Sequence, residues 1–392
     1  MVRNTVKKLR SEILDLVWSV GGTVRPAASQ VFQVWHQNST GSQKTVLRET
    51  FTETIPGIPF AGNQQAIGPA MAGLSHDLRA GYPADFDVPS TLPFGQEYLV
   101  TIPNGRMLSS LGIIISPDNV HLQDLSGGSF RGLTHHPLCY DGMYLPPVRQ
   151  LCGTAVVLAT GLGQRNYYHW TAEILPRLRL LEQAGVQPDY YCIPKRHQYH
   201  FESLVLMGIP RERLVPLSKY THLQAENLMV PSVNRQEMTQ ENAQYLYRKI
   251  AVPHGSHPKV RTSAKIYIAR RRRHWRSIQN ESRLMERLGS LGFQRYFLED
   301  MSMLEQVQLF YHADTVVGPH GSGLVNLLYC KPGTRVVEIG TPVRPSGLFH
   351  RIAHHRGLCY KNFMGIASNI QADESNILCD ENQLIALLGE MG

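Results

Sequence analysis

The chain has few cysteines, and they are not spaced for metal binding. Six cysteines are spread over 392 residues, with no Cys-x-x-Cys pair among them. The sequence therefore offers no zinc knuckle and no convincing metal cluster, and we expect no metal site. Several cysteines lie inside apolar runs, which suits buried thiols in a reducing compartment. This pattern favours a cytoplasmic protein.

Long hydrophobic runs are also absent. No uninterrupted stretch reaches ~18 apolar residues, so no transmembrane helix is predicted. Glu12 and Asp15 interrupt the only candidate apolar segment near the start, and no secretory signal is expected there. Residues 4–20 instead have the spacing of an amphipathic helix with basic residues at its start. Such a helix packs on its own protein or, as the alternative, rests as a peripheral contact on the inner face of an anionic membrane.

Composition and charge restrict the class of partner. A hydrophobic content of 42% with 18% charged residues is typical of a globular protein. The net charge of +8 implies an anionic partner. A nucleotide, a nucleic acid, a phosphorylated lipid and a membrane surface all fit, and the charge does not choose among them.

The first quarter of the chain differs in composition from the rest. Residues 21–90 are rich in Gly, Pro, Gln and Ser with little periodicity, which predicts an irregular extension over residues 1–94. Asp85-Phe-Asp87 has the form of a metal–nucleotide motif, but no helix follows it, and we interpret it as a chance match. Further on, Pro103-Asn-Gly105 separates two short apolar runs and has the chemistry of a hairpin turn.

Strands and helices then alternate in two series. Buried strands are predicted at 154–159, 190–193, 214–215 and 228–230, with helical patterns between the first three. A second series begins with the strand 265–269. This alternation predicts an α/β fold with two Rossmann-like domains facing each other across a cleft, over residues 95–236 and 237–392.

Other elements of the second series have clear signals. A helix is expected from residue 280 to 292, and Ser302 and Glu305 have the spacing of a capping box that opens the next helix. A helix is predicted over 348–356, and a strand over 358–363.

A glycine turn near the end of the second series is the most distinctive stretch. The apolar strand 315–317 stops at Gly318-Pro319, and His320, Gly321, Ser322 and Gly323 precede a periodic apolar segment that predicts a helix. Glycines let a backbone approach a ligand, and the N–H groups of a first helical turn favour negative charge. A diphosphate on the turn and a ribose hydroxyl on Glu338, at the end of the next strand, would use this geometry. The alternative is that the glycines serve packing alone.

A second cluster follows the strand that ends at Ala159. Asn166 is placed to cap a helix that Pro176 should bend. His169 and Glu173 are four residues apart, hence on one helical face and able to touch. A carboxylate beside an imidazole can orient it or can itself take a proton from a hydroxyl group. A plain surface ion pair is the alternative.

Arginines gather after the first strand of the second series. Residues 270–273 are four consecutive arginines, and His274, Trp275 and Arg276 follow. Guanidinium groups bind phosphate oxygens in bidentate fashion. Four consecutive side chains cannot all face one ligand, so we expect one or two to be functional, with Arg270 nearest the strand. A nucleic-acid patch is the rival interpretation, but the chain has no further nucleic-acid motif.

Three motifs in this order resemble the family 61 glycosyltransferases. The family's signatures are Asn-x-x-His-x-x-x-Asp/Glu, then Arg followed by Arg-x-Ile-x-Asn-Glu, then Gly-x-His-Gly-Ala/Ser-Gly-Leu. The matching residues here are Asn166, His169 and Glu173; Arg270 and 276–281; and 318–324. The resemblance covers roughly residues 95–365. Ser322 stands where Ala is common in the family, and Glu173 where eukaryotic members tend to have Asp.

The resemblance implies a fold of the glycosyltransferase-B type and inverting transfer of a sugar from a nucleotide-sugar donor to a glycan or glycolipid acceptor. It implies no cofactor or metal ion, and no nucleic-acid partner. Its implied donor residues are Arg270, Arg276, Asn280, Glu281, His320, Gly321, Ser322, Gly323 and Glu338. On the acceptor side it implies Glu173 as the base with His169 as its partner, or the reverse, and Asn166 beside them.

Synthesis of a surface or exported polysaccharide is the process in which this activity is expected. A non-catalytic nucleotide- or sugar-binding protein with the same fold is the alternative. Donor binding without turnover would favour the second hypothesis.

Overall fold

The computed structural model describes residues 99–115, 117, 125–126, 146–232, 238–256, 263–271, 276–341, 347–368 and 376–391. The predicted N-terminal helix (4–20), Asp85-Phe-Asp87 and the arginine-cluster residues 272–275 lie outside the described residues. Within the described ranges, no helix is long and apolar enough to cross a membrane.

The described residues form a mixed α/β structure with two large sheets, one after the other along the chain. The strands of the first sheet are β1 (Leu99–Pro103), β2 (Arg106–Leu108), β3 (Ile113–Ile115), β4 (Arg149–Val157), β5 (Tyr190–Pro194), β6 (Leu214–Leu217) and β7 (His222–Pro231). Their order is β3-β2-β7-β4-β5-β6, with β1 also paired to β7. The strands β7, β4, β5 and β6 are parallel, whereas β1 and β2 run antiparallel to β7.

The second sheet is parallel throughout. Its strands are β8 (Lys265–Ala269), β9 (Gln294–Phe297), β10 (Thr315–Pro319), β11 (Arg335–Gly340) and β12 (Cys359–Met364). They lie in the order β12-β11-β10-β8-β9, so the strand order reverses between β8 and β10. In open parallel sheets, ligands bind outside the carboxyl ends of the strands at such a reversal. A small ribbon of β13 (Ile366–Ala367) and β14 (Ile377–Leu378) follows.

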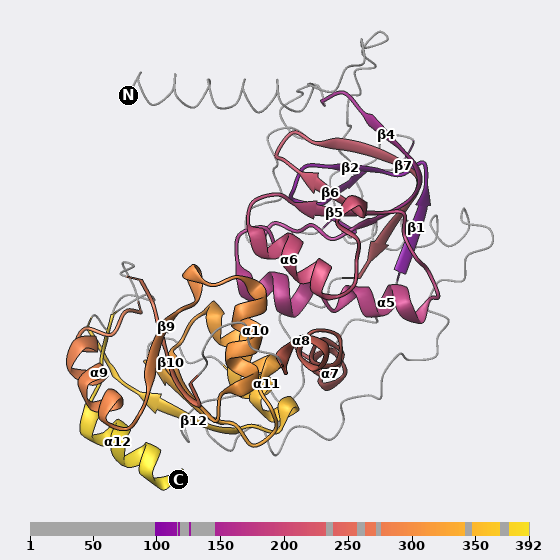
Figure 1. Cartoon of the computed structure of the whole chain (residues 1–392). Coiled ribbons are helices and arrows are strands. Elements are labelled where there is room, and N and C mark those ends of the chain that lie inside the picture. Colours follow the sequence, from indigo (N-terminus) through magenta and orange to yellow (C-terminus); the bar gives the residue numbers. More distant parts are fainter. Residues whose placement is uncertain are drawn as a thin grey trace, which may run out of the picture.

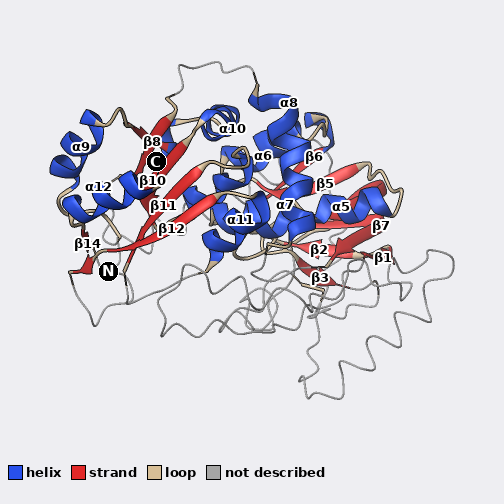
Figure 2. Cartoon of the chain, turned by 90° about the horizontal axis from the view of Figure 1, so that it is seen from below, coloured by secondary structure: helices blue, strands red, loops and turns tan. Residues whose placement is uncertain are grey.

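Helices surround and separate the two sheets. The α-helices are α4 (Tyr167–His169), α5 (Arg177–Gln183), α6 (Gln198–Leu206), α7 (Gln240–Leu246), α8 (Val252–Gly255), α9 (Glu281–Ser290), α10 (Met303–His312), α11 (Leu348–Arg356) and α12 (Glu381–Glu390). The π-helical turns are η2 (Trp170–Ile174) and η4 (Tyr247–Ala251), and the 3-10 segments are η3 (Arg211–Arg213), η5 (Leu298–Asp300) and η6 (Ser322–Tyr329). Figure 1 shows α7, α8, α10 and α11 between the two sheets, and the view in Figure 2 agrees.

One hydrophobic cluster extends through these helices from the first sheet to the second. It contains Val156 of β4 and Trp170 of η2 as well as Leu324 of η6 and Val316 of β10. Burial of aliphatic and aromatic side chains is the main favourable term in packing such elements. The helical region between the sheets is therefore a shared core.

Polar contacts attach α7 to both sides. Arg179 of α5 donates to Asn242 (3.0 Å) and to Glu241 (2.9 Å) of α7. The guanidinium of Arg356 in α11 lies 3.6 Å from the ring centre of Tyr247, which directly follows α7. The region that starts near residue 237 thus contacts the elements of both sheets, and the predicted domain boundary at 236–237 stays a prediction.

Several predicted elements are confirmed. The strand β8 and the helix α11 have the predicted bounds, and α9 begins at Glu281. The capping box at the start of α10 is formed, because the Ser302 hydroxyl accepts from the Glu305 backbone N–H while the Glu305 carboxylate accepts from the Ser302 backbone N–H. β9 had no separate prediction.

The hairpin predicted at Pro103-Asn-Gly105 was wrong. β1 and β2 both pair with β7, and the Asn104 N–H donates to the Glu226 carbonyl (2.9 Å), so the chain continues along one neighbour. Asn104 has φ of 54°, which kinks the strand without reversing it. The reversal lies between β2 and β3, where Ser109 and Gly112 adopt left-handed conformations.

Candidate active site

The first cluster begins where β4 ends. Residues 158–165 lead from the carboxyl end of β4 to Asn166, whose Oδ1 accepts from the Tyr168 N–H (2.8 Å) and caps α4. The predicted capping role is therefore confirmed. Pro176 ends the first helical stretch, and α5 starts at the next residue. The bend predicted at this proline takes the form of a break between η2 and α5.

His169 and Glu173 form the pair that their spacing predicts. Nδ1 of His169 lies 2.6 Å from Oε1 of Glu173, and the two side chains are 19% and 6% exposed. Glu173 lies in the π-helical turn η2, closed by the bond from the Leu175 N–H to the Trp170 carbonyl (3.1 Å). π-turns inside helices occur frequently at functional sites. Because Glu173 uses Nδ1, the Nε2 atom of His169 remains for another partner.

Neighbouring groups near this pair stay neutral. Burial lowers the pKa of His200 to about 4, and its Nε2 bonds the Gly163 carbonyl (3.1 Å) while its ring packs on Trp170. Burial also raises the pKa of Tyr167 well above its ordinary value. Tyr167 therefore keeps its proton, which it donates to Oδ1 of Asn326 in η6 (2.7 Å).

The glycine turn follows β10, at the reversal of strand order in the second sheet. The helix predicted after it is present and is of the 3-10 type, η6. Gly321 has an extended backbone (φ 177°) that any residue can adopt. A glycine is favoured there because a Cβ atom would lie only 2.7 Å from Nη1 of Arg270. A Cβ on Gly323 would lie 2.7 Å from Cδ1 of Leu298. Both glycines permit close packing, and Gly321 makes room for an arginine.

Arg270 joins the second motif to the third. It follows β8, and its Nη1 donates to the His320 carbonyl (2.7 Å). Arg271, the next residue, is instead exposed and pairs with Asp300. Arg276 adopts a left-handed conformation (φ 57°), which is uncommon for a residue with a side chain. The structure thus sets Arg270 apart from Arg271, and Arg270 directly follows β8, as expected from its place nearest the strand. Its role in binding the donor stays a prediction.

The first and third motifs touch each other directly. The Ser322 hydroxyl donates to Oδ1 of Asn166 (3.0 Å), 156 residues away in the chain. A series of ring contacts also leads from His169 to Tyr168 (5.5 Å), from Tyr168 to Phe349 (5.9 Å) and from Phe349 to His320 (5.1 Å). His169 and Glu173 therefore lie near His320 and not on a remote outer surface.

His320 and Glu338 form a second imidazole–carboxylate pair. Nδ1 of His320 pairs with Oε1 of Glu338, and Oε2 of Glu338 accepts from the hydroxyl of Tyr360 in β12. Sequence reasoning missed this pair and its partner Tyr360. The ribose role of Glu338 stays a prediction.

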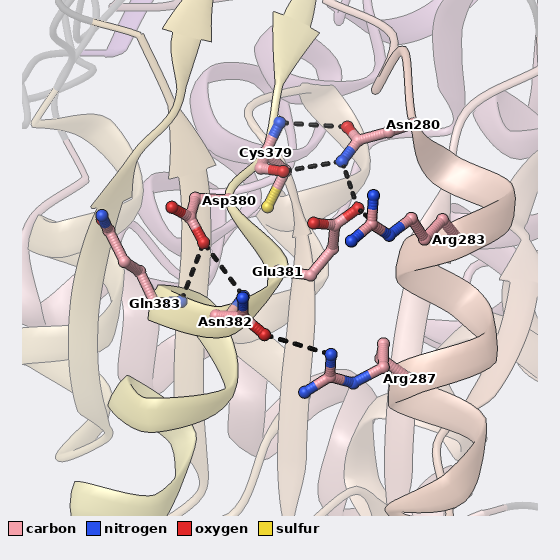
Figure 3. A network of polar contacts seen from close by, with 8 residues as sticks. All are labelled: Asn280, Arg283, Arg287, Cys379, Asp380, Glu381, Asn382 and Gln383. Carbon is pink, nitrogen blue, oxygen red and sulfur yellow. Dashed lines mark hydrogen bonds and ion pairs between the residues drawn. The ribbon is translucent and has the colours of Figure 1, made fainter.

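Asn280 and Glu281 have partners away from the glycine turn. The Asn280 amide donates to the Cys379 carbonyl (2.6 Å) and to Glu381 (2.6 Å), and its Oδ1 accepts from the Cys379 N–H (3.1 Å), as Figure 3 shows. Glu281 accepts from the hydroxyl of Tyr267 (2.9 Å). The Asn280 contacts attach the start of α9 to the C-terminal segment, and the Glu281 contact attaches it to β8. The donor-binding role of both residues stays a prediction.

The same C-terminal segment supports the stretch just before α9. The Gln279 N–H donates to the Ile377 carbonyl (2.8 Å), and the Ile377 N–H donates to the Ser277 carbonyl (2.9 Å). Glu381 sits at the first turn of α12; burial opposes its ionisation, but a backbone hydrogen bond, Asn280 and Arg283 outweigh that effect and lower its pKa. The stretch that carries Arg276 is thus held by residues about a hundred positions later.

Across the described ranges, no three His, Cys, Asp or Glu side chains converge in a way that could hold a metal ion. The expectation that no metal takes part stays a prediction.

The protein has a mixed α/β structure in which Asn166, at the start of the helix that carries the His169–Glu173 pair, contacts Ser322 of the glycine turn at the strand reversal of the second sheet. Residues 167–337 match the family Glycosyltransferase 61, and this match confirms the resemblance of the three motifs to that family. Glycosyltransferase activity is what the family suggests. Asn166 and Glu338 directly adjoin the two ends of the matched region. Among curated proteins, no match is found.

Proposed function

We propose that the protein is an inverting glycosyltransferase that moves a sugar from a nucleotide-sugar donor to a glycan or glycolipid acceptor in the synthesis of a surface or exported polysaccharide. We further propose that the two sheets with their helices form the two halves of a glycosyltransferase-B fold. The contact between Ser322 and Asn166 carries the proposal, because it joins the first motif to the glycine turn of the third.

The donor diphosphate is assigned to the second sheet. Arg270 and the N–H groups of Gly321 to Gly323 lie at the carboxyl ends of β8 and β10, where the strand order reverses. The backbone N–H of His320 donates instead to the Ile339 carbonyl (2.9 Å). The N-terminus of a helix contributes about 1 kcal/mol to binding of an anion. The arginines therefore supply much of the stabilisation, with Arg276, Asn280, Glu281 and Glu338 as further proposed donor-side residues.

The acceptor hydroxyl is assigned to the first motif. In an inverting single displacement, the acceptor oxygen attacks the sugar C1 while the bond from C1 to the diphosphate oxygen breaks. We assign Glu173 as the base that takes the hydroxyl proton, with His169 oriented beside it and Asn166 holding the start of the helix. The distance of 2.6 Å between His169 and Glu173 supports a shared proton-accepting unit in which the two roles can also be exchanged.

The test is to incubate the purified protein with a panel of nucleotide sugars and to measure binding by calorimetry and product formation by mass spectrometry. Binding of one donor with turnover supports the proposal, and NMR of the product reveals whether the anomeric configuration is inverted. Failure to bind any donor would count heavily against it. Binding without turnover, unchanged in Glu173→Gln, would favour a non-catalytic nucleotide- or sugar-binding protein.

A further inference from the structure

Both the backbone and the ring of His320 have partners among the described residues. Its backbone N–H donates to the Ile339 carbonyl (2.9 Å), and its carbonyl accepts from Arg270 (2.7 Å). Its ring packs at a tilt against Phe349 at 5.1 Å. The backbone contacts fix the place of the residue, and the atom that binds Nδ1 then sets the orientation and tautomer of the ring.

That atom belongs to Glu338. The parallel register pairs Gly318 of β10 with Glu338 of β11, which brings the carboxylate beside the residue that follows β10. The Glu338 side chain is 3% exposed, and its second oxygen accepts from Tyr360. Tyr360 lies opposite Val336 in the register of β11 and β12, diagonally beside Glu338 on the same face of the sheet.

We propose that Glu338 is a positioning residue that holds His320 through Nδ1, with Tyr360 as the second donor to the same carboxylate, so that Nε2–H of His320 faces the leaving diphosphate. This inference rests on the proposed function and deepens it. A carboxylate on Nδ1 fixes the ring orientation and stabilises the imidazolium, as in the Ser-His-Asp arrangement. The ribose alternative is disfavoured because both Glu338 oxygens are engaged and the side chain is buried.

The sugar transfer needs only the donor, the acceptor and the protein's own acid and base groups. When the bond between the sugar C1 and the diphosphate oxygen breaks, the electron pair stays on that oxygen, and C1 bonds to the acceptor oxygen. The acceptor proton passes to Glu173 or His169. The imidazolium Nε2–H of His320 donates to the departing oxygen, where negative charge develops, while Arg270 is the neighbouring cation.

Steady-state kinetics with the donor that the wild type uses test the inference. Glu338→Gln is expected to lower kcat by about 100-fold with a small change in donor KM, because removal of an oriented proton donor acts on the transition state. Tyr360→Phe is expected to lower kcat by about threefold to tenfold. Glu299→Gln and Tyr296→Phe, exposed or half-buried residues near the same sheet, serve as matched controls and should leave kcat unchanged.

A double-mutant cycle separates positioning from direct binding. The variant His320→Gln combined with Glu338→Gln should be no slower than His320→Gln alone, within about threefold, because a positioning residue acts only through its target. If Glu338 instead binds ribose, the two losses multiply. Calorimetry would then also show weaker binding, by about tenfold or more, of the nucleoside diphosphate of that donor in Glu338→Gln, while inorganic pyrophosphate binding is unchanged.

A spectroscopic measurement keeps the inference testable even if the protein proves to transfer no sugar. In long-range proton–nitrogen NMR spectra, the His320 signals are those missing in His320→Gln. The wild type should show Nδ1 protonated and strongly hydrogen-bonded at mildly alkaline pH, and Glu338→Gln and Tyr360→Phe should shift this signal. A wild-type His320 protonated on Nε2 alone, or spectra unchanged in both variants, would overturn the positioning role independently of the proposed activity.

Discussion

The two imidazole–carboxylate pairs are built in different ways. His169 and Glu173 are four residues apart on one helical segment, and their contact is local. His320 and Glu338 are 18 residues apart, and they meet because β10 and β11 pair in parallel register. The first pair depends on helical geometry alone, whereas the second needs two strands, an intervening 3-10 helix and a register.

Substitutions in the two pairs should therefore have different effects on the surrounding structure. Glu173 is supported by its own helix, so a substitution there should change chemistry and little else. Glu338 lies in β11, an inner strand of the second sheet, and contacts Tyr360 of the edge strand β12, so its environment depends on the pairing of several strands.

The largest effect is expected from breaking the local pair. Glu173→Gln should lower kcat by about 10²-fold to 10⁴-fold, because a glutamine does not accept the acceptor proton. Circular dichroism should show an unchanged fold, and donor KM should change little. Glu212→Gln, an exposed glutamate of the same half, is the control. A smaller loss for Glu173→Gln than for His169→Gln would assign the base to His169.

The next effect tests the arginine beside the second pair. Arg270→Ala should lower kcat/KM for the donor by about 30-fold to 100-fold, in line with about 2–3 kcal/mol for hydrogen bonds from a charged group. Arg271→Ala is a matched control, since Arg271 is exposed and pairs with Asp300; its effect should stay within about threefold. Equal losses in both variants would contradict the special position of Arg270.

Support of the second half from the C-terminus is tested by Asn280→Ala. The variant loses three hydrogen bonds to Cys379 and Glu381 (Figure 3), and the free energy of unfolding in urea should fall by about 2–3 kcal/mol. Asn382→Ala, which removes the exposed contact to Arg287, should cost no more than about 0.5 kcal/mol. Unchanged stability with weakened donor binding would instead assign Asn280 to the donor.

Lowering the pH should reduce the free energy of unfolding, because each half of the molecule contains a buried histidine. Burial lowers the pKa of His200, near the first pair, and of His355, in α11, to about 4 in each case. The unfolded chain then binds more protons than the folded one below the ordinary histidine pKa of about 6.5, so stability falls as pH drops from about 6.5 towards 4. Each histidine contributes a slope of about 1.4 kcal/mol per pH unit there. Urea unfolding from neutral to acidic pH measures it; a His200→Gln variant with the same slope would contradict the assignment.

The smallest effect concerns the bond between the two halves. Ser322→Ala removes the hydrogen bond to Asn166 and should reduce kcat/KM by about fivefold, equivalent to about 1 kcal/mol. Ser290→Ala, which removes an exposed contact within α9, should leave activity unchanged. An equal and small effect in both would show that the contact between the motifs has no catalytic consequence.

Much of the fold was predictable because local sequence patterns, such as apolar runs and capping residues, indicate its strands and helices. Buried strands such as β8 are continuous apolar runs, and the start of α10 carries its capping box in the residues themselves. The error at residues 103–105 arose because a turn-forming Pro-Asn-Gly is compatible with a kinked strand when one long neighbour, β7, accompanies both parts. The pairing partner lies more than a hundred residues away and leaves no local signal.

In the candidate site, too, the local contacts were predictable and the contacts between distant residues were not. The contact between His169 and Glu173 followed from their spacing, and the role of Asn166 as a cap followed from its place at the start of the predicted helix. Nothing in the sequence pointed to Tyr360 as the partner of Glu338, because that contact depends on the order and register of β11 and β12. The anchoring of Asn280 by the C-terminal segment was unexpected for the same reason.

Three features follow from the sequence alone: the alternation of strands and helices, the three motifs with their family resemblance, and the local His169–Glu173 pair. These features depend on neighbours within one helical turn or one strand, where spacing sets geometry. Three other contacts are known only from the tertiary structure. Ser322 donates to Asn166, Arg270 donates to the carbonyl of His320 in the glycine turn, and the Glu338 carboxylate binds both His320 and Tyr360. Those contacts arise from strand order and helix packing, which bring together residues that chain distance leaves unrelated.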